Sequence, residues 1–87
     1  MMDETQIKSA IEKKRGSTPY AIWTIGITND PERRKNEHKS EGKNVTHWSH
    51  WYADSESIAR RIEDHFLNKG MKGGGGGGEN PRYVYVF

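Results

Sequence analysis

The chain has 87 residues, which suits one globular domain, since domains usually need about 50–200 residues. It has no cysteine, which excludes disulfides, cysteine-ligated zinc and cysteine nucleophiles, and no apolar run of the length that a signal peptide or a membrane span requires. The 14 Lys and Arg residues and 12 Asp and Glu residues give a net charge of +2, so nucleic-acid binding would need positive charge concentrated in one place. We expect a single cytoplasmic domain over residues 1–87 without a membrane partner.

The N-terminal part of the chain predicts a helix followed by a strand. Ile7, Ala10 and Ile11 recur at helical spacing, and a glycine and a proline then end the pattern. We expect residues 1–16 to form a peripheral N-terminal helix. Residues 20–28 are rich in β-branched and aromatic side chains that alternate between two faces, which is typical of a strand.

The next segment predicts a polar and basic helix. Asp30 can cap a helix that has Pro31 at its first position and ends near Gly42. The segment concentrates positive charge, which is carried by Arg33, Arg34, Lys35, His38, Lys39 and Lys43. Since the helix has no apolar stripe, it needs either the backbone of its neighbours or a ligand to hold it.

The second half of the chain continues the alternation of helices and strands. Residues 45–53 predict a second strand, Asp54 caps a helix that runs to residue 69, and residues 83–87 predict a third strand. The glycine-rich segment 71–80 is expected to be a flexible loop that returns the chain to the sheet. The predicted class is α+β, in the order α-β-α-β-α-β around a three-stranded sheet.

Two features could carry chemistry. Glu63 falls inside the apolar arc of its helix, where a carboxylate must either pair with a nearby arginine or bind a cation. Arg34 and His38 lie four residues apart and therefore on one helical face, where a guanidinium and an imidazole suit a phosphodiester. The alternative for this pair is a solvated surface.

The segment from Thr24 to His38, Thr-Ile-Gly-Ile-Thr-Asn-Asp-Pro-Glu-Arg-Arg-Lys-Asn-Glu-His, resembles the second half of the GIY-YIG nuclease signature. In that family a strand ending in Tyr-Ile-Gly leads into a helix with an essential arginine and a histidine. The spacings from Thr24 to Arg34 and on to His38 match, and the resemblance covers about residues 22–66.

The resemblance implies a fold and a mechanism. Glu63 follows Ala59 by four residues, as the metal-binding glutamate of the family follows an alanine. The implied fold is a small, mainly antiparallel three-stranded sheet flanked by helices. The implied activity is Mg²⁺-dependent hydrolysis of DNA, in which Glu63 holds the metal, Arg34 stabilises the phosphate in the transition state and His38 contacts phosphate or relays a proton. His47 is a weaker candidate.

The chain departs from the family pattern at the first half of the signature. Thr24 stands where the family has tyrosine, and no Gly-Ile-Tyr strand precedes it. The C-terminal strand 83–87 is a candidate for the vacant place, in a circularly permuted arrangement that predicts its pairing with residues 22–28. Tyr85 is then the candidate phenol, because Tyr83 lies nearer the entry of the strand; the alternative is that both tyrosines only pack.

Three functions follow from these patterns. The first is a DNA- or phosphodiester-binding GIY-YIG-like domain that acts as a Mg²⁺-dependent endonuclease. The second is a catalytically inactive module of the same fold that binds a nucleic acid, a nucleotide or a protein, and the third is a homo-oligomeric structural protein. Besides the catalytic candidates Thr24, Arg34, His38, Glu63 and Tyr85, the expected nucleic-acid contacts are Arg33, Lys35, Lys39, His47 and Asn80.

Overall fold

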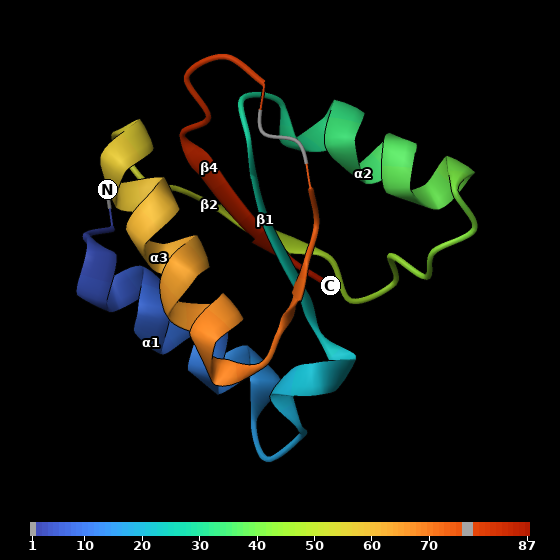
Figure 1. The fold of residues 1–87 in the computed structure, drawn as a ribbon, viewed down its shortest axis with the longest axis horizontal. Coiled ribbons are helices and arrows are strands. Elements are labelled where there is room, and N and C mark those ends of the chain that lie inside the picture. Colours follow the sequence, from blue (N-terminus) through green and yellow to red (C-terminus); the bar gives the residue numbers. More distant parts are fainter. Residues whose placement is uncertain (1, 76–77) are drawn as a thin grey trace.

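The computed structural model describes residues 2–75 and 78–87, which form three α-helices and a four-stranded sheet. Helices α1 (Glu4–Arg15) and α3 (Glu56–Lys69) lie together on one side of the sheet, and α2 (Pro31–Ser40) lies on the other side (Figure 1). The α+β class predicted from the sequence is therefore confirmed.

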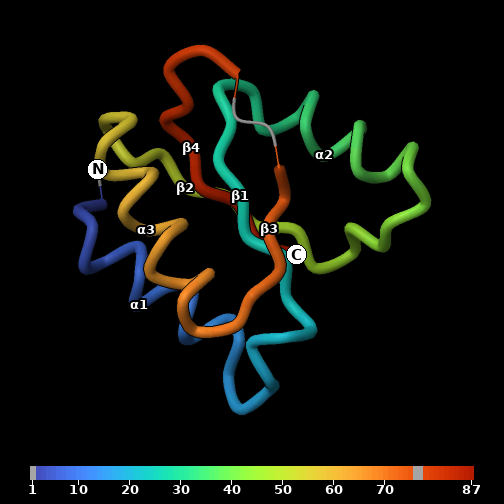
Figure 2. The backbone as a smooth tube through the Cα atoms, in the orientation of Figure 1, coloured from blue at the N-terminus to red at the C-terminus, as the bar shows by residue number. Residues whose placement is uncertain are grey.

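The sheet has the strand order β2-β4-β1-β3. Its strands are β1 (Thr24–Thr28), β2 (Ser49–Tyr52), β3 (Lys72–Gly73) and β4 (Tyr83–Val86). The C-terminal strand β4 lies between β1 and β2 and is antiparallel to both, so its predicted pairing with the first strand is confirmed. β3 runs parallel to β1 (Figure 2). The expected three-stranded antiparallel sheet is thus corrected to a four-stranded mixed sheet.

The fourth strand comes from the segment predicted to be a flexible loop. The Lys72 N–H donates to the Trp23 carbonyl at 2.9 Å, and the Gly74 N–H donates to the Ile25 carbonyl at 2.7 Å. The free edge of β1 supplies these acceptors, and glycine lets the two backbones approach closely. The start of the segment 71–80 is therefore part of the sheet, while residues 76–77 of it lie outside the described residues.

The apolar core fills the space between the sheet and the pair α1 and α3. Its buried members include Ile7 and Ile11 of α1, Ala59, Ile62 and Phe66 of α3, Ile25 and Ile27 of β1, and Val84 and Val86 of β4. The expectation of a peripheral N-terminal helix is wrong, because α1 places two fully buried isoleucines in this core. A short apolar stripe is enough for that when α3 offers a matching face.

The helix ends follow local rules. Asp3 forms a capping box with Gln6 at the start of α1, and the Asp30 carboxylate accepts from the Arg33 N–H at the start of α2. α3 is capped by Ser55, one residue later than predicted. A short 3₁₀ turn (Tyr20–Ile22) leads into β1.

The second strand is shorter than predicted. Of the expected residues 45–53, Ser49–Tyr52 pair with β4, and a turn precedes them in which the Trp48 N–H donates to the Val45 carbonyl. Within residues 2–75 and 78–87, no helix combines the length and the apolar character needed to cross a membrane.

Candidate functional site

Tyr85 lies at the centre of the sheet face that α2 covers. It is fully buried and pairs with Gly26 of β1. A Cβ atom on Gly26 would overlap the Tyr85 hydroxyl and lie 2.8 Å from its ring Cε2, and a Cβ atom on Gly74 would overlap the same hydroxyl. The hydroxyl therefore occupies a space that exists only because both backbone positions are glycine.

His38 joins α2 to this tyrosine. It is the one buried residue of α2, and its Nε2 lies 2.8 Å from the Tyr85 hydroxyl. Its ring also packs against Phe87, with ring centroids 4.8 Å apart. Burial lowers the pKa of His38, and the positive charges of Arg34 and Lys43 lower it further, so the imidazole favours its neutral form. This contact explains how a helix without an apolar stripe is held on the sheet.

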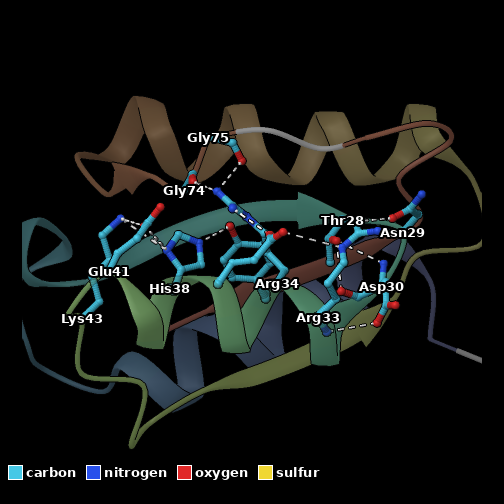
Figure 3. A network of polar contacts seen from close by, with 12 residues as sticks. Thr28, Asn29, Asp30, Arg33, Arg34, His38, Glu41, Lys43, Gly74 and Gly75 are labelled. Carbon is cyan, nitrogen blue, oxygen red and sulfur yellow. Dashed lines mark hydrogen bonds and ion pairs between the residues drawn. The ribbon is translucent and has the colours of Figure 1, made fainter.

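Arg34 lies one helical turn before His38 and points toward the start of the glycine-rich segment (Figure 3). Its Nη2 donates to the Gly74 carbonyl at 2.5 Å and to the Gly75 carbonyl at 3.3 Å, and its Nη1 donates to Glu37 Oε1 at 3.0 Å. Its buried Nε has no hydrogen-bond partner among the described residues. The guanidinium therefore has two neutral carbonyls and the Glu37 carboxylate as partners, and one donor still available.

Electrostatics connect Tyr85 to two charged groups. Burial raises the pKa of Tyr85, the Arg34 guanidinium beside the phenol opposes this rise, and the negative charge of Glu63 adds to it. The Tyr85 phenol thus lies within electrostatic reach of a cation on α2 and an anion on α3.

Glu63 is half-buried on α3 and has no ion pair or hydrogen bond from its side chain among the described residues. The adjacent arginines are engaged elsewhere, since Arg60 binds Glu56 at 2.7 Å and Arg61 binds Glu4 at 2.9 Å. Burial raises the pKa of the Glu63 carboxyl, and Asp64 raises it further against the opposing charge of Arg60. Of the two sequence-based alternatives, pairing with a neighbouring arginine is therefore wrong.

Thr24, the remaining predicted catalytic residue, and Tyr83, the other tyrosine of β4, make no hydrogen bond to Arg34 or His38 among the described residues. Thr24 is buried at the start of β1, and among the described residues no hydrogen bond joins its hydroxyl to Arg34 or His38. Tyr83 packs edge to face against Tyr52, with ring centroids 5.3 Å apart, and no hydrogen bond joins it to Arg34 among the described residues.

Three of the predicted nucleic-acid contacts lie on α2, and the other two lie on loops. Lys35 and Lys39 line an open groove along α2 together with Lys43. Arg33 is held by Asn29 at 2.9 Å. His47 and Asn80 are exposed loop residues, and the structure gives neither of them a contact with Arg34 or Tyr85 among the described residues.

Sequence reasoning missed two residues that contact the site. Trp48 stacks on the Tyr85 ring with centroids 4.4 Å apart and an interplanar angle of 12°. Lys43 Nζ lies 3.3 Å from His38 Nδ1 (Figure 3). The left-handed backbone of Gly42 (φ 86°) returns the chain over the end of α2 and so places Lys43 there, an arrangement that helical spacing does not reveal.

Comparisons of the chain with known protein families, with curated proteins and with solved structures give no match. Among the described residues there is also no group of three or more His, Asp or Glu side chains that could hold a metal ion. A functional proposal therefore depends on the arrangement of Arg34, His38, Tyr85 and Glu63.

Proposed function

We propose that the chain is a circularly permuted GIY-YIG-like domain that binds DNA and hydrolyses its phosphodiester bonds. In this proposal β4 takes the place of the missing Gly-Ile-Tyr strand, and Tyr85 supplies the phenol that Thr24 cannot. The observation that supports it most is the meeting of Tyr85 with His38 and Arg34 of α2, which lie 47 and 51 residues away from Tyr85 in sequence.

Arg34 would stabilise the charge that develops on the phosphate in the transition state. A phosphate oxygen is a stronger partner for a guanidinium than a neutral carbonyl is, because both groups are charged. Phosphate would therefore compete well with the carbonyls of Gly74 and Gly75, and the buried Nε offers a further donor. Preorganised donors of this kind usually supply the largest share of catalysis.

Tyr85 would act as the general base in its ionised form: the phenol first loses its own proton to solvent, and the phenolate, hydrogen-bonded to His38 at 2.8 Å, then accepts the proton of the attacking water. The lysines of the groove along α2 would contact neighbouring phosphates, which gives a local positive surface to a chain whose net charge is only +2.

The residues present fit a Mg²⁺ ion held by Glu63. Mg²⁺ commonly takes one or two protein carboxylates and completes its shell with water and substrate phosphates, so a single carboxylate without an arginine partner is sufficient. When bound, the ion supplies charge neutralisation at the phosphate. The raised pKa of the Glu63 carboxyl means that a bound cation would relieve an unfavourable burial of negative charge.

The test is cleavage of single- and double-stranded DNA in Mg²⁺ or in EDTA. We expect cleavage only with Mg²⁺, its loss in Glu63→Gln, and a fall of about 10²–10⁴-fold in Tyr85→Phe. Asp64→Asn is the matched control, because it removes the same charge from the exposed neighbouring position. Cleavage in EDTA, or full activity of Glu63→Gln, would contradict the proposal.

A non-catalytic binding module is the second candidate, and one observation favours it. The Arg34 guanidinium is already bonded to Gly74 and Gly75, which could hold it as a structural group. If DNA binds without being cut in Mg²⁺, and Glu63→Gln binds as the wild type does, this second function is the better description.

A further inference from the structure

The two ring nitrogens of His38 face different partners. Nε2 faces the Tyr85 hydroxyl at 2.8 Å, while Nδ1 faces Lys43 Nζ at 3.3 Å and Glu41 Oε1 at 3.7 Å (Figure 3). Lys43 and Glu41 also form an ion pair at 3.4 Å. Nδ1 is therefore unprotonated if it accepts a hydrogen bond from Lys43, and protonated if it donates one to Glu41.

The donor inventory of these groups decides the tautomer. A lysine ammonium has three donors and no acceptor, and a neutral imidazole has one donor nitrogen and one acceptor nitrogen. If Lys43 donates to Nδ1, the ring proton must be on Nε2, which then donates to the Tyr85 oxygen. The Glu41 carboxylate lies 3.7 Å from Nδ1, beyond hydrogen-bond distance, and is paired with Lys43.

The electrostatic surroundings of His38 agree with a neutral ring. The charged groups around it are Arg34 and Glu37 on α2, Glu41 and Lys43 just beyond its end, and the titratable Tyr85 on β4. Burial is the largest cause of its lowered pKa.

We infer that Lys43 is a positioning residue that holds His38 in the Nε2–H tautomer and so fixes the direction of the hydrogen bond from His38 to Tyr85. The Tyr85 oxygen then accepts a hydrogen bond from His38 Nε2, and the hydroxyl proton of Tyr85 is not donated to His38. Because a phenolate can only accept, this arrangement stabilises the ionised form of Tyr85. The catalytic consequence depends on the proposed function, whereas the tautomer does not.

The first test is ¹⁵N NMR of the His38 ring in the protein without substrate. In the wild type we expect the resonance of an unprotonated nitrogen at Nδ1 and of a protonated one at Nε2. In Lys43→Met the freed Glu41 carboxylate can accept from Nδ1, so the two resonances should exchange or average. Lys43→Arg should retain the wild-type pattern, and so should Lys39→Met, which removes one charge from the same groove without touching His38.

A second readout applies if the protein cleaves DNA. Loss of a hydrogen bond to the phenolate should move the pH of half-maximal cleavage upward by roughly one unit in Lys43→Met, and Lys13→Met, at an exposed position of α1, should leave it unchanged. A protonated Nδ1 in the wild type, or an unchanged Nε2–H tautomer in Lys43→Met, would overturn the inference. The NMR experiment tests the His38 tautomer even if the protein does not cleave DNA, so the inference and the proposed function can fail independently.

Discussion

Removing the hydroxyl of Tyr85 tests whether its contact with His38 stabilises the fold. Both side chains are fully buried and share one hydrogen bond of 2.8 Å. In Tyr85→Phe, His38 Nε2 would lose its partner at a fully buried position, and an unsatisfied buried group of this kind costs about 1–3 kcal/mol. We therefore expect the free energy of unfolding to fall by about 2 kcal/mol.

Equilibrium urea denaturation measures this loss directly. With a slope of about 1–3 kcal/mol per molar urea for a small domain, the midpoint should fall by roughly 1 M. Thermal unfolding should report the same change as a decrease of about 4–8 °C per kcal/mol.

Tyr83→Phe is the matched control. It makes the same chemical change two residues earlier in β4, at a half-buried ring whose hydroxyl has no hydrogen bond within the part of the chain that the structure describes. Its effect should stay within about 0.5 kcal/mol. Equal midpoints for the two variants would refute the reasoning, because they would show that the buried bond to His38 adds nothing to stability.

Three further predictions concern neighbouring positions. Gly26→Ala should lower the free energy of unfolding by about 1–3 kcal/mol, because its Cβ would overlap Tyr85, whereas Gly73→Ala, whose Cβ would make an ordinary contact at 3.6 Å, should change it little in the same denaturation assay. Arg34→Ala should weaken DNA binding and reduce the slope of log affinity against log salt by about 0.9, the value for one phosphate contact; an unchanged slope in a fluorescence titration would exclude that contact. Burial lowers the pKa of His38, so the unfolded chain takes up more protons and the free energy of unfolding should fall as the pH drops below about 6.5, with a smaller fall in His38→Gln.

Local signals in the sequence were sufficient for much of the fold. Capping by Asp30 and the proline after it located the start of α2, and alternation placed Tyr85 on the same face as Tyr83. The position of Tyr85 next to α2 also followed from one assumption, that the last strand pairs with the first. These features depend on residues a few positions apart, or on a single pairing.

The remaining features depend on contacts that no local pattern records. β3 has two residues and contains no alternation, so the free edge of β1 defines it rather than its own sequence. Lys43 meets His38 only because Gly42 turns the backbone back over α2. The engagement of Arg60 with Glu56, which leaves Glu63 without an arginine, also requires knowledge of rotamers.

Two sides of the space that holds the Tyr85 hydroxyl are formed by main chain alone, at Gly26 and Gly74. The main chain has the same chemistry at every residue, so these two sides cannot adjust the properties of the phenol. A side chain at either position would occupy the space of the Tyr85 hydroxyl. The acidity and orientation of the phenol can therefore vary through side chains on its remaining sides, such as Arg34 and His38 on α2 and Trp48 across the ring. A designer who wishes to change the reactivity of Tyr85 can therefore alter the side chains around it but should leave Gly26 and Gly74 unchanged.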